Sequence, residues 1–227
     1  GYTLIEGDCK EGQHTVIRRP PENSPLNISE YLSLNEIVKH SSQESFAKEL
    51  EWVFGGIEEC LQQGLKPEDI MVISLDDRNA KSYFDGLARR LVEKEISFNN
   101  VHGSRFSVPN FFIEDHITLS TVYKAKGNEA SVVFVCGVDA VVPYLNDIKT
   151  RNKIFTAFTR AKALLRVSGV GDVSSGIMDE INKALNNYPD MIFDYPNPQD
   201  IPLIQRDLES KSEKLRELED KLAELDD

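Results

Sequence analysis

Cysteine is scarce in this chain, and no membrane or secretion signal accompanies it. The three cysteines lie far apart and fit neither a zinc-binding spacing nor a disulfide framework. Such usage is typical of proteins in a reducing compartment, so we expect a cytoplasmic location. The chain also lacks any run of about 18 apolar residues and any amino-terminal signal peptide, which predicts no membrane association. No metal site is expected, because His14, His40, His102 and His116 form no metal-ligand motif.

Basic residues are also in short supply. The 227 residues include 26 lysines and arginines against 38 aspartates and glutamates, which gives a formal net charge of −12. A protein that coats DNA by itself is usually basic, so this composition argues against that class. Net charge governs solubility and long-range steering, however, and it leaves room for a local basic groove. The length allows one large domain or one domain with appendages, and the hydrophobic content of 40% is enough for a core.

Apolar runs alternate with helical patterns through the middle of the chain. The expected helices span 44–63, 79–93, 152–163 and 177–185, and the expected strands span 70–75, 96–101, 117–122, 131–138 and 164–170. Several of these strands are apolar without alternation, which is typical of a parallel sheet that helices cover on both faces. The order of the elements therefore predicts an α/β fold with a doubly wound parallel sheet over residues 41–190.

The two ends of the chain differ in composition from the middle. Residues 1–40 carry turn and proline signals but no segment large enough to found a domain, so we expect an irregular lead-in. Prolines over 191–203 indicate a linker. In 204–227, mostly leucines follow alternating steps of four and three, which predicts a C-terminal heptad helix. This helix suits self-association as a coiled coil, and it equally suits packing back on the domain.

Two aspartates directly follow the expected strand 70–75. Asp76 and Asp77 are expected at the carboxyl edge of the sheet, where ligands of α/β proteins tend to bind. N-cap preferences nevertheless favour a plainer interpretation, in which these acids cap the helix expected from residue 79.

A polar stretch that reads TVYKAKGNE follows the strand expected at 117–122. Lys124 and Lys126 can meet phosphate as point charges, and Tyr123 can stack on a base. Gly127 allows a tight turn or the close approach of a ligand. The carboxylate of Glu129 can accept a hydrogen bond from a ribose hydroxyl. Taken alone, the same residues also suit a solvated turn between two strands.

A second stretch, KIFTAFTRAK, lies in the helix expected at 152–163. Its apolar residues suit packing against the sheet. Arg160 stands between Phe158 and Leu164, where a guanidinium must either find an anion or extend to solvent. The default for a single arginine is the solvent-exposed surface, and the alternative is an anion such as a phosphate group.

Together the two stretches resemble the late motifs of the UvrD/Rep-like DNA helicases of superfamily 1. One family motif reads roughly T-x-H-x-A-K-G-x-E, and the next reads roughly Y-x-A-x-T-R-A-K. The matching residues are Thr121, Ala125, Lys126, Gly127 and Glu129, followed by Ala157, Thr159, Arg160, Ala161 and Lys162. The resemblance covers residues 44–171 and implies the second, C-terminal RecA-like domain of such a helicase.

The resemblance also implies a nucleotide site that this chain completes only in part. Arg160 matches the catalytic arginine finger, which reaches the ATP γ-phosphate across a cleft and stabilises the phosphoryl-transfer transition state. The residues implied beside the nucleotide are Lys126, Gly127 and Glu129.

The resemblance implies contact with single-stranded nucleic acid, which is DNA for a DNA helicase, at Thr121, Tyr123 and Lys124. This sequence departs from the family motif at three positions. Tyr123 replaces the usual histidine, and Asn128 and Ala130 replace the usual leucine and phenylalanine.

The chain lacks the motifs that hold the phosphates of ATP and the magnesium ion. It contains no G-x-x-x-x-G-K-[ST] phosphate loop and no DExx-type box after an apolar strand. The resemblance therefore implies that ATP and Mg²⁺ are held by an N-terminal RecA-like domain outside this sequence, which would be the partner of residues 41–190. We expect the joined protein to be an ATP-dependent helicase and this fragment alone to be inactive.

Two other functions stay open at this point. One is a catalytically vestigial RecA-like interaction module that dimerises or recruits a partner through residues 204–227. The other is a small α/β hydrolase or transferase unrelated to helicases, although no G-x-S-x-G elbow and no metal-ligand cluster supports it.

Overall fold

The computed structural model describes residues 1–23, 28–103 and 110–197. The heptad helix expected over 204–227 lies outside these residues, as does the second half of the expected linker. The described chain divides into two units. The larger unit comprises residues 1–3 and 18–191, and the smaller one comprises residues 4–17 and the described residues from 192 onward.

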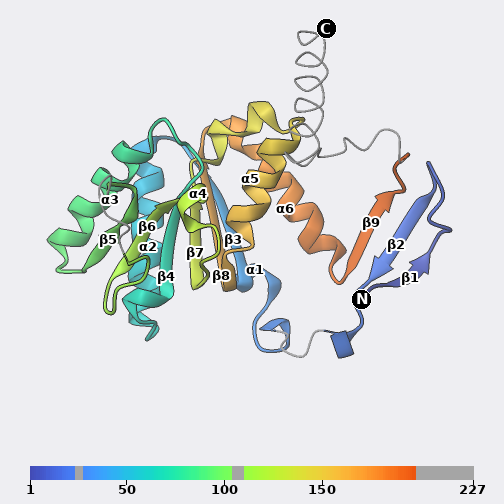
Figure 1. The fold of residues 1–227 in the computed structure, drawn as a ribbon, viewed down its shortest axis with the longest axis horizontal. Helices are drawn as coiled ribbons and strands as arrows, with labels where there is room; N and C mark the ends of the chain where they lie inside the picture. The colour runs from blue at the N-terminus through green and yellow to red at the C-terminus, as the bar shows by residue number, and fades with distance from the viewer. Residues whose placement is uncertain (24–27, 104–109, 198–227) are drawn as a thin grey trace, which may run out of the picture. The chain divides into compact units, whose positions relative to one another are not determined.

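Six parallel strands form the sheet of the larger unit, in the order β3-β8-β7-β4-β6-β5 (Figure 1). The strands are β3 (Val38–Gln43), β4 (Ile70–Ser74), β5 (Phe98–Asn100), β6 (Ile117–Thr121), β7 (Ala130–Cys136) and β8 (Ala161–Val170). Every neighbouring pair in this sheet runs parallel. The predicted α/β architecture with a parallel sheet is therefore confirmed.

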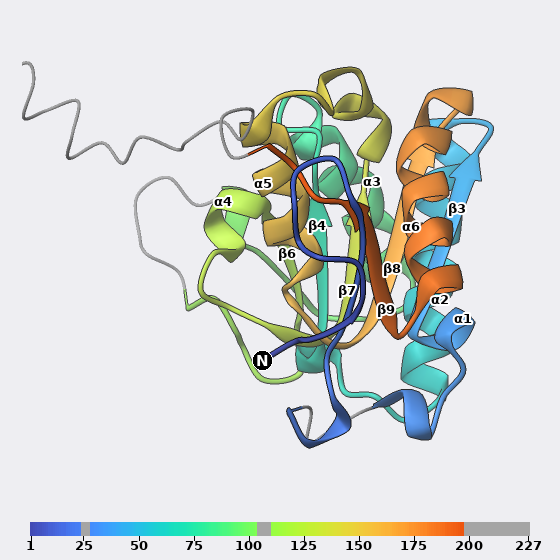
Figure 2. The ribbon, with the colours of Figure 1, turned by 90° about the vertical axis from the view of Figure 1, so that its right-hand side faces the viewer.

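Helices cover both faces of this sheet (Figures 1 and 2). The helices are α1 (Leu34–Ile37), α2 (Phe46–Gln62), α3 (Ala80–Glu93), α4 (Val122–Ala125), α5 (Ile148–Phe158) and α6 (Ser175–Asn187). Alternate residues of β4 serve the two faces, because successive strand side chains point to opposite sides. Ile70 and Val72 pack with α2 and α3, whereas Met71 and Ile73 pack with α4, α5 and α6.

The first 40 residues contain more regular structure than the irregular lead-in that the sequence predicts. Strand β3 begins at Val38, and it is missed because its sequence, VKHSSQ, is largely polar. As an edge strand it hydrogen-bonds only to β8 and needs little burial. The smaller unit contains most of a three-stranded sheet of β1 (Thr3–Glu6), β2 (His14–Arg18) and β9 (Asp190–Asp194).

The end of α5 also differs from the helix expected at 152–163. The helix stops at Phe158, where Thr159 forms its C-cap, and β8 already begins at Ala161. The reason is long-range pairing, because Ala161 is in register with Ala130 of β7. Arg160 therefore lies in the turn between helix and strand rather than inside a helix. Within the described ranges, no helix combines the length and apolarity that crossing a bilayer requires.

Candidate functional site

The two motif stretches meet where β7 and β8 begin. The amide of Ala130 donates to the carbonyl of Arg160 at 3.0 Å, and Nη1 of Arg160 donates to the carbonyl of Asn128 at 3.4 Å. Glu129 directly precedes Ala130 and is exposed at the same edge of the sheet. The sequence predicts this meeting from motif order, and the structure brings these residues together through backbone pairing.

In the described part of the chain, the guanidinium of Arg160 donates hydrogen bonds only to neutral acceptors. Its Nε donates to the carbonyl of Thr156 at 3.0 Å, and its Nη2 donates to Oγ1 of Thr159 at 3.2 Å. The side chain is half-buried, and no carboxylate in the described part of the chain forms an ion pair with it. A partly desolvated guanidinium without a counter-ion favours an incoming anion.

Gly127 shapes the loop that leads to this edge. Its φ of +87° lies in the left-handed region, which glycine adopts at little cost. A Cβ built at this position meets nothing within 4 Å. The glycine is therefore required by the backbone conformation of the loop, and no neighbouring atom in this chain requires it.

A basic groove runs between α4 and α5, which lie side by side (Figure 2). It encloses about 340 Å³ and is lined by Val122, Tyr123, Lys126, Lys149, Asn152, Lys153 and Thr156. Lys126 and Tyr123 are the two sequence-predicted residues in this groove. Thr156 connects the groove to the edge described above, because its carbonyl accepts the hydrogen bond from Arg160.

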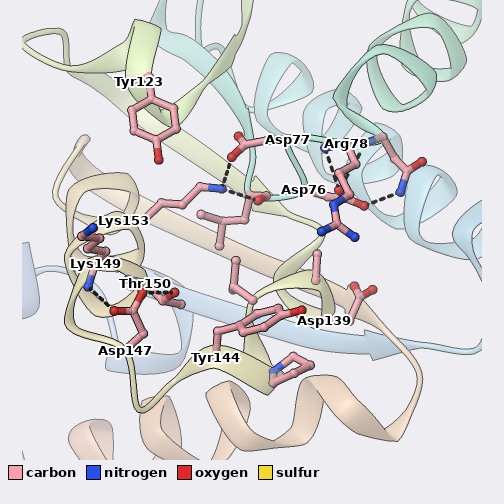
Figure 3. Close-up of a pocket in the computed structure, with 15 residues that line it drawn as sticks. Asp76, Asp77, Arg78, Tyr123, Asp139, Tyr144, Asp147, Lys149, Thr150 and Lys153 are labelled. Carbon is pink, nitrogen blue, oxygen red and sulfur yellow. Dashed lines mark hydrogen bonds and ion pairs between the residues drawn. The ribbon is translucent and has the colours of Figure 1, made fainter.

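Lys153 joins the groove to the carboxyl edge of the sheet (Figure 3). Its ammonium donates to the Leu75 carbonyl at 2.7 Å and to Oδ2 of Asp77 at 2.6 Å. The same ammonium lies 5.8 Å from the ring centroid of Tyr123, within the range of a cation–π contact. Tyr123 is 72% exposed, so one face of its ring stays available.

The two aspartates that follow β4 have separate partners. The carboxylate of Asp76 accepts hydrogen bonds from the amides of Arg78 and Asn79 at 3.0 and 3.2 Å. This arrangement closes the turn before α3, but the N-cap of that helix is Asn79, so neither aspartate caps the helix itself. Asp77 instead pairs with Lys153 and holds α5 against the end of β4.

Thr121 and Lys124 lie apart from the groove. Thr121 is the last residue of β6 and is buried, with 8% of its surface exposed. The ammonium of Lys124 donates to the carbonyl of Val101 at 2.7 Å, on the 3₁₀ turn Val101–Gly103. Because β6 and β7 run parallel, Thr121 lies at the carboxyl ends of the strands, and the start of β7 lies at their amino ends. The residues expected to form one site therefore lie on two surfaces, one where β7 and β8 begin and one at the end of β6. The groove between α4 and α5 connects these surfaces.

The motifs do not predict Lys149 and Lys153, which supply two of the three groove lysines. The available signal is their i, i+4 spacing, which places both on one face of α5. No motif includes them, and only the packing of α4 against α5 shows that this face meets Lys126. Across the described ranges, no group of three or more His, Cys, Asp or Glu side chains is placed to hold a metal ion.

Comparison with known proteins supports the resemblance inferred from the motifs. Residues 116–168 match the family described as UvrD-like helicase C-terminal domain, and this range contains both motif stretches and the groove lysines. Among solved structures, the C-terminal domain of a possible DNA helicase from Lactobacillus plantarum WCFS1 is similar, with 14% identity and a TM-score of 0.49. That alignment covers 70% of this chain and 90% of the other. No curated protein sequence matches the chain.

Proposed function

We propose that this chain is the C-terminal motor domain of an ATP-dependent DNA helicase or translocase. A helicase-related role in general follows from the match of residues 116–168 to UvrD-like helicase C-terminal domains. One observation carries the finer proposal. Among the described residues, the guanidinium of Arg160 donates only to neutral acceptors, and it lies against the loop that presents Glu129. This is the arrangement that an arginine finger and a ribose acceptor need at the rim of a shared nucleotide cleft.

In this proposal the cleft is completed by an N-terminal RecA-like domain that carries the phosphate loop and the magnesium ligands. Arg160 exchanges its long 3.4 Å contact with Asn128 for a γ-phosphate oxygen and stabilises charge in the transition state. The carboxylate of Glu129 accepts a hydrogen bond from a ribose hydroxyl, and the turn at Gly127 sets the position of Glu129. Lys126 provides a positive charge between the groove and the start of β7 and β8, where the nucleotide is proposed to bind.

The groove between α4 and α5 is proposed as part of the nucleic-acid track. Tyr123 offers an exposed ring for base stacking, and Lys126 and Lys149 are exposed where a phosphate backbone can reach them. Lys153 keeps the Tyr123 ring and the end of β4 in place. Thr121 and Lys124 are proposed as flanking contacts. Thr121 is the last residue of β6, two positions before Tyr123, and Lys124 donates a hydrogen bond to the carbonyl of Val101.

The test is ATP hydrolysis by the longer protein that joins this chain to its phosphate-loop domain. Arg160→Ala should lower kcat by about a thousandfold, because an arginine finger contributes on that order to phosphoryl transfer. Arg89→Ala is the matched control, since Arg89 is an exposed arginine on α3, and it should leave kcat unchanged. An Arg160→Ala protein with the wild-type kcat contradicts the proposal.

A further inference from the structure

An apolar groove lies between α5 and α6, on the face of the sheet that both helices cover (Figure 1). It encloses about 520 Å³. The apolar side chains that form its two helical walls and its floor on β3 and β8 include Val38, Phe155, Phe158, Leu165, Ile181 and Leu185. Arg160 and the three lysines of the basic groove are not part of this lining. The apolar groove is therefore separate from the surfaces used in the proposed function.

Phe155 makes this groove an open apolar surface. It is 68% exposed, although it lies in a helix that packs on the sheet. Phe158 and Leu185 are only partly buried against the core beneath them. A contiguous apolar surface of this kind on a soluble domain usually marks a place where another segment or molecule packs.

The two charged residues of the lining neutralise each other. Nη2 of Arg151 donates to Oε1 of Glu180 at 2.9 Å, and this ion pair joins the first turn of α5 to α6. A charged ligand would have to compete with that pair, and it would also lose water against apolar walls. The groove therefore suits apolar side chains better than an ionic ligand.

Both walls of the groove follow one residue spacing. The lining residues that are separated by steps of four and three are Arg151, Phe155 and Phe158 on α5, and Ile177, Ile181 and Ala184 on α6. This spacing places the residues of each wall on one side of its helix, and it is the spacing with which helices pack along a common seam. A third segment with the same spacing therefore matches the space between α5 and α6.

The part of this chain that carries the same spacing is the stretch 215–225, which lies outside the described residues. Its seam consists of Leu215, Leu218, Leu222 and Leu225. The residues between these leucines are charged, except for Ala223. The stretch is as long as α5, which has 11 residues, and Lys211, which interrupts the seam, lies before it. Its length and its apolar side thus match the groove.

The connecting chain is long enough for this stretch to reach the groove of its own molecule. Helix α6 ends at Asn187, and the about 27 residues before Leu215 could span about 90 Å if they were extended. Helix α5 is only about 16 Å long at 1.5 Å per residue. Because a tethered segment binds at a high effective concentration, docking within one chain is favoured over docking on a second copy.

We propose that residues 215–225 dock in the apolar groove of the same chain. Their leucines pack between the walls formed by Phe155 and Ile181, and the charged residues between the leucines face solvent. This inference does not depend on the proposed helicase function, since it uses neither Arg160 nor the basic groove.

The test measures whether this stretch shields the groove from a thiol reagent. In the full chain, Cys9→Ser removes the exposed native thiol, and the other two cysteines are buried. Ala184→Cys then places a thiol at an exposed position on the α6 wall. Leu222→Glu should raise the reaction rate of that thiol by about tenfold or more, because burial of one leucine stabilises the docked state by at least that factor.

Ala223→Glu is the matched control, since it introduces the same charge one position away from the seam. It should leave the reaction rate unchanged. Phe155→Ala tests the groove side of the contact and should raise the rate as Leu222→Glu does. We also expect a monomer in sedimentation and a reaction rate that does not change with protein concentration.

Two results overturn the proposal. One is an equal reaction rate in the parent chain, in the Leu222→Glu variant and in the Phe155→Ala variant, which shows that the groove is not covered by this stretch. The other is shielding that increases with protein concentration, which assigns the groove to the same stretch of a second copy.

Discussion

Glu49 is a carboxyl group in the interior of the larger unit, and burial raises its pKa above the ordinary value of 4.5. Burial is the largest influence, and it outweighs the hydrogen bonds from Tyr83, Gly137 and Ser168 that favour the charged form. The folded chain therefore holds a proton on Glu49 at pH values where the unfolded chain has released it.

This shift gives the stability a definite pH dependence. The contribution of Glu49 is fully present below the unfolded pKa of 4.5 and is lost as pH rises through the higher folded pKa. We expect the free energy of unfolding to fall over that window more steeply in the wild type than in Glu49→Gln, as measured by urea denaturation at a series of pH values. Glu180→Gln should keep the wild-type slope. An identical slope in all three proteins contradicts the assignment.

Arg160 and Arg166 show why a residue type alone does not reveal a role. Arg166 is 7% exposed, burial lowers its pKa, and its Nη1 donates to the carbonyl of Ile37 at 3.1 Å. It ties the segment before β3 to β8 and serves the fold. Arg160 lies six positions earlier in the chain, and the motif around it is the sequence feature that points to a functional role.

Helix α2 packs closely against β7. A Cβ built at Gly56 lies 2.7 Å from Cε1 and 3.1 Å from Cζ of Phe134, whose side chain is fully buried. At the neighbouring Gly55, a Cβ meets nothing within 4 Å. One helix thus carries two adjacent glycines, of which only one is required by packing.

These glycines give a paired prediction for α2. Gly55→Ala should raise the free energy of unfolding by up to about 1 kcal/mol, because alanine favours the helix. Gly56→Ala should lower it by about 1–3 kcal/mol, because the ring of Phe134 has no room to move. Chemical denaturation of both variants measures the difference. Stabilisation by Gly56→Ala to the same extent as by Gly55→Ala shows that the contact is looser than the structure indicates.

The elements also differ in how well the sequence predicts them. Helices α2 and α3 and strands β4, β6 and β7 follow strong apolar patterns, and the structure places them within a few residues of the expected bounds. Strands β3 and β9 are largely polar or exposed, and their pairing partners lie far along the chain. Local pattern cannot indicate such strands, because their hydrogen bonds come from distant segments.

For the whole molecule, the negative net charge makes the basic groove decisive for the proposed nucleic-acid binding. A chain with net charge −12 gains little from non-specific attraction, so Lys126 and Lys149 must supply the contacts locally. Binding to a labelled single-stranded DNA should weaken steeply with salt. Lys126→Ala and Lys149→Ala should each make the slope of log affinity against log salt shallower by about 0.7. Lys183→Ala on α6 is the control and should leave the slope unchanged.

The same experiment separates the helicase proposal from the interaction-module alternative. The alternative has one structural observation in its favour, because Leu4, Ile5 and Ile192 of the three-stranded sheet are 46%, 51% and 37% exposed. A module of that kind predicts no salt-dependent DNA binding and no effect of the groove lysines. Self-association through residues 204–227 stays a proposal, and sedimentation of the chain with and without that segment tests it. A monomer in both cases removes it.

The α/β alternation, the apolar strands and the order of the two motifs can be predicted from local sequence, because they depend on the residue types along single segments. The tertiary structure decided which of those residues meet. It paired Ala130 with Ala161 and so brought Arg160 to Asn128, and it packed α4 on α5 and so added Lys149 and Lys153 to the groove. It also buried Glu49 beside Tyr83. Such contacts join segments far apart in the chain, and only the pairing and packing of the whole sheet fix them.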